Sequence, residues 1–150
     1  MTDVAGPRTA EVTAARRMFG GLPTLHVATL GRRGEPHVVP LWFVWPEDAV
    51  YVSTRQGSGT WRNVERDPRV SMSVDVGRAW TELVGVTISG RAELLEAERP
   101  ETRSAISAWH DKYRALFAGE GFSRFAEEID RLGFVRVEVD RLVGWDHART

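Results

Sequence analysis

The chain has 150 residues, a length typical of one domain with one continuous core, so we expect residues 1–150 to form a single domain. Its 20 Lys and Arg against 21 Asp and Glu give a formal net charge of -1, without the basic excess that nucleic acid binding requires. Cysteine is absent, which excludes disulfides, thiolate metal sites and thiol catalysis. The sequence also lacks a membrane-spanning apolar run and the apolar core of a signal peptide, so we expect a cytoplasmic protein.

The first part of the chain predicts a helix followed by three strands. Apolar residues recur at helical spacing over 9–19, and Gly20-Gly21 ends that short helix. Strand patterns follow over 24–30, 37–45 and 49–54, separated by short turn-forming clusters. Consecutive strands with short turns pair as an antiparallel meander.

The rest of the chain mixes helix and strand patterns. Further strands are predicted over 69–76, 82–95 and 134–139, and helices over 60–67, 100–118 and 122–132. Gly85 and Gly90 lie where a strongly curved sheet would bulge. Six antiparallel strands with helical insertions, including a helical pair at about 100–132, predict a mainly β (α+β) fold built on a small closed barrel. Such a barrel has little interior room, so we expect a cofactor on its outside or between subunits.

The sequence offers no set of residues for nucleophilic or metal chemistry. It has no Gly-x-Ser-x-Gly turn, and its four histidines are scattered along the chain. We therefore predict no metal site and assign no catalytic residue. Tyr51 and His37 are candidate proton donors to a reduced product.

The segment from Ser53 to Asn63 combines hydroxyls, an arginine and glycines where a strand ends and a helix begins, with Ser58 as the expected N-cap. A helix N-terminus presents unpaired N–H groups and partial positive charge, and glycine lets an anion approach the backbone. The segment is therefore a candidate phosphate cradle; an ordinary capped loop is the alternative.

The chain resembles the pyridoxamine 5'-phosphate oxidase-like split-barrel family, in particular its flavin/deazaflavin oxidoreductase branch. The resemblance runs in order from about Leu22 to Asp146. It rests on Gly34-Glu35-Pro36-His37-Val38-Val39-Pro40-Leu41-Trp42-Phe43, Tyr51-Val52-Ser53-Thr54, Arg62-Asn63-Val64, Asp67-Pro68-Arg69-Val70, Gly90-Arg91-Ala92 and Gly144-Trp145-Asp146. It implies a six-stranded antiparallel split β-barrel that forms homodimers, with FMN or coenzyme F420 in a groove between the subunits.

The resemblance also implies where the cofactor lies. The phosphate is expected at Ser53, Thr54, Arg55 and Ser58, and the tricyclic ring along the second strand. The expected cofactor-binding residues are His37, Val39, Pro40, Leu41, Trp42, Ser53, Thr54, Arg55, Ser58, Gly59, Thr60, Trp61, Arg62 and Asn63. Tyr51, Trp80 and Trp145 are substrate or interface candidates.

This chain departs from the family pattern directly after Ser58. The family usually has a basic pair ending in Lys, whereas this chain has Gly59-Thr60, followed by Trp61 where a small aliphatic residue is commoner. Losing a charged hydrogen bond to phosphate weakens affinity by roughly tenfold or more. Either Arg55 and Arg62 compensate for this loss or the protein binds its cofactor weakly. The anionic glutamyl tail of F420 requires exposed arginines, and four lie near the expected phosphate site; ordinary solvated side chains are the alternative for these four, which are Arg55, Arg62, Arg66 and Arg69.

These observations lead to two hypotheses from different functional classes. The first is a homodimeric oxidoreductase that transfers a hydride from reduced F420 to a flat conjugated small molecule, with FMN as the alternative cofactor. The second is a non-catalytic protein that carries a flavin, haem or another apolar ligand in the same groove. The missing Lys and the bulky Trp61 motivate the second.

Overall fold

The computed structural model describes residues 9–117, 119, 122–123, 126–128 and 131–149. Its helices are α1 (Thr9–Phe19), α2 (Gly59–Arg66), α3 (Pro100–Leu116) and the short 3-10 turns η1 (Trp80–Glu82) and η3 (His147–Arg149). Its strands are β1 (Thr24–Leu30), β2 (Pro36–Val44), β3 (Ala49–Arg55), β4 (Arg69–Val76), β5 (Val84–Leu95), β6 (Leu132–Glu138) and β7 (Arg141–Asp146).

Within the described residues the strands form one antiparallel seven-stranded sheet in the order β4-β1-β2-β3-β6-β5-β7. An additional pairing of β4 with β5 closes six of these strands into a barrel. Alternate residues of β1, for example Leu25 and Val27, point into the barrel and are buried. The predicted six-stranded split barrel is therefore confirmed, with one strand added.

The added strand β7 continues the line of β6 along the same edge of β5. Ser89 pairs with Arg141 and Ala92 with Val137, so two residues of β5 oppose three on the other strand. That mismatch is a β-bulge opposite Gly90, where a side chain would collide with the Glu138 carbonyl. The extra residue lies between β6 and β7, whereas β5, where the bulge was expected, pairs with β4 without a break at Gly90. The β4–β5 ladder runs unbroken past Gly85, which instead makes room for the Trp145 ring.

Two details of the predicted elements are wrong. The final strand pattern was expected to end the sheet at 139, but the chain turns after the bulge and pairs again over Arg141–Asp146. Leu132, expected as the end of a helix, begins β6. Much of the predicted helix over 122–132 lies outside the described residues.

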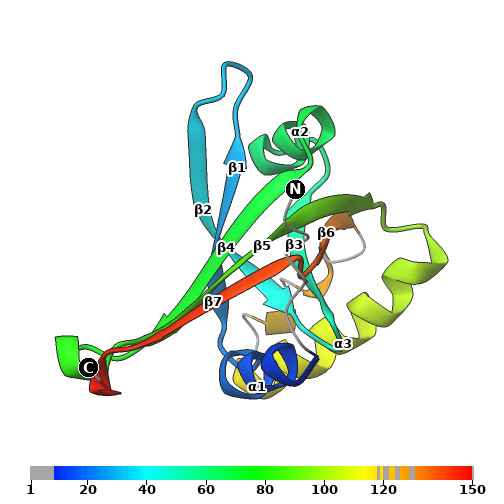
Figure 1. Cartoon of the computed structure of the whole chain (residues 1–150). Helices are drawn as coiled ribbons and strands as arrows, with labels where there is room; N and C mark the ends of the chain where they lie inside the picture. Colours follow the sequence, from blue (N-terminus) through cyan, green and yellow to red (C-terminus); the bar gives the residue numbers. More distant parts are fainter. Residues whose placement is uncertain (1–8, 118, 120–121, 124–125, 129–130, 150) are drawn as a thin grey trace.

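The buried apolar residues form two clusters on opposite sides of the barrel wall. The first fills the barrel and includes Val12, Ala15 and Phe19 of α1, which close its lower end. The second lies outside the wall, where Trp109 and Tyr113 of α3 pack against β2, β3 and β6. Figure 1 shows α1 below the barrel, α2 above it and α3 beside it. Trp42 packs against the outer cluster, and Trp45, directly after β2, belongs to the inner cluster.

A split in the barrel wall positions the candidate site. β2 and β3 pair only at Phe43 with Val52 and at Val44 with Tyr51. Beyond that point β2 stays with β1 and β3 stays with β6, so the two strands separate. The opposite end of the molecule differs, because β4, β5 and β7 extend together as an arm that ends in η1 and η3 (Figure 1). None of the helices in the described parts of the chain has the length and apolar character to cross a bilayer.

Candidate functional site

A groove of about 430 Å³ lies at the split between β2 and β3. It is lined by Pro40, Leu41, Trp42, Ser53, Thr54, Arg55, Ser58 and Leu132. Seven of these eight residues were expected at a cofactor site from the resemblance, and the fold brings them together from β2, β3 and the loop that precedes α2. Leu132 was not expected, because nothing in the sequence indicates that the start of β6 reaches this groove.

The apolar end of the groove is built around Trp42, which is held by aromatic residues of α3. The Trp42 ring stacks on Tyr113 at a centroid distance of 4.2 Å and lies 5.3 Å from Trp109. The Tyr113 hydroxyl accepts a hydrogen bond from the Phe43 N–H at 2.7 Å and lies within donating distance of two carbonyls, Pro23 at 2.8 Å and Phe43 at 3.0 Å. Burial raises the pKa of Tyr113, so the phenol stays protonated. Trp42 thus rests on a rigid, fully buried support.

Lys112, the single lysine of the sequence, reinforces the same support. Its ammonium donates to the Phe43 carbonyl at 2.7 Å and lies 3.6 Å from the centroid of the Phe43 ring. Desolvation lowers the pKa of Lys112 to about 7. The lysine therefore belongs to the junction of α3 with β2, and the groove lining does not include it.

Ser53 closes the lower end of the split and is not a free phosphate ligand. Its hydroxyl donates to the Trp42 carbonyl at 3.2 Å and accepts from the Trp109 indole N–H at 3.2 Å. These two bonds connect β3, β2 and α3 at one atom. We therefore assign Ser53 a supporting role in the groove.

The polar end of the groove is formed by Thr54, Arg55 and Ser58, and α2 begins directly after Ser58. The two hydroxyls are 2.8 Å apart and hydrogen-bonded, and Ser58 accepts from the Trp61 N–H at 3.2 Å as the predicted N-cap. Ser58 has an extended backbone, so the chain turns into the helix directly at the groove. Arg55 is exposed beside it and forms a salt bridge with Glu128 at 2.9 Å.

The inner face of α2 is packed against the barrel rather than facing the groove. Thr60, Trp61 and Asn63 are all buried, with Trp61 only 5 % exposed. The Trp61 ring covers Gly133, where a Cβ would lie 2.3 Å from the ring. The structure therefore places Trp61 and Thr60 away from the groove lining, although both were expected to contact the cofactor.

His37 and Val39 face the upper interior of the barrel, because they pair with the inward-facing Thr29 and Val27. His37 Nδ1 lies 3.5 Å from the Thr29 hydroxyl. Its other ring nitrogen lies against α2, 3.6 Å from where a Cβ of Gly59 would be. His37 thus reaches the first residue of α2, beside the polar end of the groove.

The remaining candidates lie elsewhere. Tyr51 accepts a hydrogen bond from Arg136 at 3.2 Å in a separate hollow. Trp80 is 69 % exposed at the tip of the arm, where its ring lies tilted against His147. Trp145 of β7 covers Gly85 of β5. None of the three lines the groove in this chain. Among the described residues no group of His, Asp and Glu side chains is arranged to hold a metal ion.

The groove therefore combines a flat apolar wall at one end with hydroxyls and helix N–H groups at the other. This arrangement suits a planar molecule that carries an anionic group. The sequence did not indicate that three supporting residues belong to the site: Trp109, Tyr113 and Lys112. The helical spacing of their segment shows an apolar face but does not indicate which strand that face covers.

Comparison with known proteins agrees with the fold. The profile of the family described as pyridoxamine 5'-phosphate oxidase matches residues 12–146. A conserved hypothetical protein from Mycobacterium tuberculosis, Rv2991, is 25% identical with a TM-score of 0.75, covering 98% of this chain and 89% of that one. No curated protein matched the sequence.

Two further similar structures carry names that mention a ligand. One is described as an F420 reductase, at 19% identity and a TM-score of 0.62, covering 85% of this chain and 94% of that one. The other is HutZ, described as a haem storage protein from Vibrio cholerae, at 20% identity and a TM-score of 0.66, covering 91% and 94%. At these identities the likeness extends to the fold alone. The match over 12–146 and the split barrel together show that this chain belongs to the pyridoxamine 5'-phosphate oxidase family.

Proposed function

We propose that this protein is an oxidoreductase that transfers a hydride from reduced coenzyme F420 to a flat conjugated small molecule. The observation that carries the proposal is the groove between β2 and β3, with Trp42 at one end and Thr54 and Ser58 at the other. The deazaflavin supplies the hydride when bound, so the protein needs to bind the ring, orient the acceptor and exclude water.

The residues at the polar end fit a phosphate without the lysine that is usual in the family. Thr54, Ser58 and the first turn of α2 offer hydroxyl and backbone donors, and Arg55 supplies a nearby positive charge. Thr60, which stands where the family usually has that lysine, is buried here. A lysine side chain at this position would have to extend out of the core. The absence of that lysine is therefore compatible with the way α2 packs in this chain.

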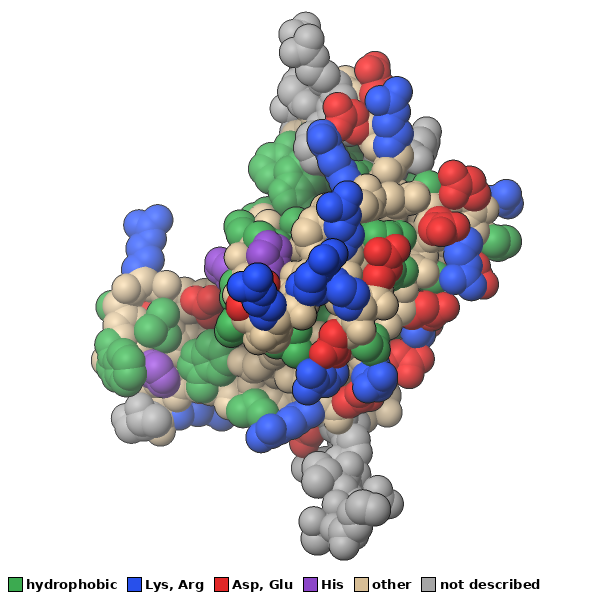
Figure 2. Space-filling model, turned by 90° about the horizontal axis from the view of Figure 1, so that it is seen from above, with side chains coloured by type: hydrophobic (Ala, Val, Ile, Leu, Met, Phe, Trp, Pro, Cys, Tyr) green, Lys and Arg blue, Asp and Glu red, His purple; other side chains and the backbone are tan. Residues whose placement is uncertain are grey.

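Arginines at the upper end of the barrel support F420 over FMN. Figure 2 looks down on this end and shows Lys and Arg side chains gathered across its middle. Exposed arginines come from the β1–β2 turn, α2, β4 and β5: Arg32, Arg33, Arg62, Arg66, Arg69 and Arg91. The glutamyl tail of F420 is anionic, and FMN has no such tail. Arg69 pairs with Asp67 at 2.6 Å, Arg55 with Glu128, and Arg66 donates to Asn63, so we assign tail binding to Arg62 first.

We further propose that the protein acts as a homodimer through the outer face of the sheet. Strand register places Pro40, His26, Ser73, Thr87 and Val143 in one row across β2, β1, β4, β5 and β7. The row is free of acidic side chains, and the apolar residues Val38 and Val143 on this face are 58% and 45% exposed. A flat face of small and apolar side chains is suited to pairing with a second copy.

Non-catalytic binding of FMN or haem is the competing function, and the name of HutZ as a haem storage protein supports it. The bulk of Trp61, one of the two reasons for considering this function, is a weaker argument in the structure, because the Trp61 ring packs on Gly133 and leaves the groove open.

A titration of purified protein with F420, FMN and haem, each followed by fluorescence or absorbance, tests the proposal. We expect micromolar or tighter binding of F420 and turnover of an enone or quinone with reduced F420. Protein that purifies yellow with FMN would replace F420 with FMN as the cofactor, and protein that binds haem and not F420 would replace the proposal with the non-catalytic function. Sedimentation of wild-type protein and of Val38→Glu tests the dimer: a monomeric wild type would contradict it.

A further inference from the structure

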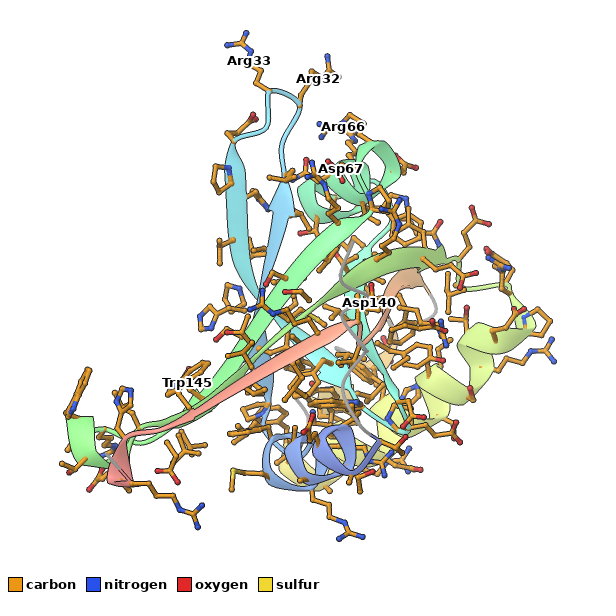
Figure 3. All side chains as sticks on the ribbon, viewed as in Figure 1. Arg32, Arg33, Arg66, Asp67, Asp140 and Trp145 are labelled. Carbon is orange, nitrogen blue, oxygen red and sulfur yellow. The ribbon has the colours of Figure 1, made fainter. Side chains whose placement is uncertain are left out.

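A buried line of hydrogen bonds runs from the surface of α2 into the mouth of the barrel and ends at His37. Arg66 donates to the Asn63 side-chain oxygen, and the Asn63 amide nitrogen donates to the Thr29 hydroxyl at 3.0 Å. Thr29 in turn lies 3.5 Å from His37 Nδ1. Figure 3 shows Arg66 at the exposed outer end of this line. The other end lies beside Gly59 at the polar end of the groove.

The polarity of this line is fixed by its first member. A guanidinium can only donate, so Asn63 accepts from Arg66 with its oxygen and must present its NH₂ group to Thr29. A threonine hydroxyl has one proton, and since Thr29 accepts from Asn63, that proton is available for His37 Nδ1. A neutral imidazole that accepts at Nδ1 carries its own proton on Nε2.

The burial of the middle members indicates that the line is built into the fold. Thr29 is 2% exposed and Asn63 is 6% exposed, beside a barrel interior that is filled by a cluster of apolar side chains. Burying an amide and a hydroxyl is costly unless each is hydrogen-bonded, and here the two satisfy each other. An apolar pair of similar size would fill the same space without that requirement.

We propose that Thr29 and Asn63, oriented by Arg66, are positioning residues that hold His37 as an Nε2–H donor toward the first turn of α2. This inference rests on the proposed function, in which that turn receives the cofactor phosphate. The Nε2 atom of His37 lies against Gly59, the residue that follows Ser58 in the sequence. The Ser58 hydroxyl is in turn hydrogen-bonded to that of Thr54. The donor of His37 then joins the hydroxyls and the helix N–H groups around one anionic oxygen. Thr29 and Asn63 do not touch the cofactor and act through His37.

The tautomer of His37 in the ligand-free protein tests the line itself. Long-range ¹H–¹⁵N spectra at a pH where histidine is neutral distinguish the two tautomers, and a His37→Gln spectrum assigns the signals. We expect the Nε2–H form in the wild type and in Thr29→Ser, and loss of that preference in Thr29→Val, which removes only the hydroxyl. An Nδ1–H form in the wild type, or an unchanged tautomer in Thr29→Val, would overturn the proposal.

Binding of F420 to the same variants tests what the line is for. We expect Thr29→Val to bind F420 about tenfold more weakly, the effect of one lost oriented hydrogen bond, with Thr29→Ser close to wild type. Thr9→Val, which removes a hydroxyl from the exposed start of α1, is the matched control and should leave affinity unchanged. Equal affinity of Thr29→Val and wild type would overturn the assigned purpose. If the wild type binds no F420, the proposed function fails, while the tautomer still decides whether the line exists.

Discussion

The two ends of the groove differ in where their supporting residues come from. The polar end is built from one continuous stretch, Thr54 to Ser58, in which a strand ends and the cap of a helix follows. The apolar end depends on α3, whose Tyr113 bonds to Phe43 across 70 positions of sequence. The polar end is therefore a local motif, whereas the apolar end is a product of tertiary packing.

The largest effect is expected from removing the support of the apolar end. Trp109→Ala deletes a fully buried ring that contacts Trp42 and Tyr113 and bonds to Ser53. We expect a loss of about 3–5 kcal/mol in the free energy of unfolding, measured by urea denaturation. Trp109→Phe keeps an aromatic ring and should lose clearly less. A loss below about 1 kcal/mol in the alanine variant would contradict the rigid support described for Trp42.

The packing of α2 against β6 gives the next effect. In Gly133→Ala the new methyl group would lie 2.3 Å from the Trp61 ring, so the helix or the strand has to shift. Overpacking of this kind costs about 1–3 kcal/mol. Adding Trp61→Leu removes the colliding ring, so the double variant should be more stable than the sum of the two single changes predicts. Additive changes in the free energy of unfolding would contradict the contact between the Trp61 ring and Gly133.

The polar end is expected to tolerate change better. Ser58→Ala removes the N-cap of α2 and leaves Thr54 without its hydroxyl partner. We expect a loss of about 1 kcal/mol in thermal or urea unfolding. Ser107→Ala, at an exposed position of α3, is the control and should change stability little. A Ser58→Ala variant as stable as that control would show that the cap does not hold the helix.

The effect of pH on Lys112 is measured as a slope of stability against pH. Its pKa is lowered to about 7 in the folded chain, against 10.5 ordinarily. Between these values the unfolded chain binds a proton that the folded chain has released, so stability rises with pH over about 7 to 10.5. The wild type should therefore gain stability relative to Lys112→Met as the pH is raised through this window. A constant difference between the two proteins would contradict the desolvated environment of this amine.

The same contrast explains how much was predictable from the sequence. The strands over 24–30 and 69–76 and the capped helix after Ser58 follow from local periodicity and cap chemistry, and their bounds agree with the structure to within a residue. β7 was missed because Asp140 and Arg141 interrupt the alternation, and its pairing depends on a bulge opposite Gly90. The inward packing of Trp61 depends on Gly133, which is distant in sequence. Periodicity identifies a buried face but not its partner.

The most direct test of the central claim is the affinity for F420 of a variant in which only the polar end of the groove is changed. In Thr54→Val combined with Ser58→Ala, both hydroxyls are lost, and Arg103→Gln on the exposed face of α3 serves as the control. The account predicts micromolar or tighter binding by the wild type and the control, and binding at least about tenfold weaker in the double variant. Equal affinity for F420 in all three proteins would contradict it.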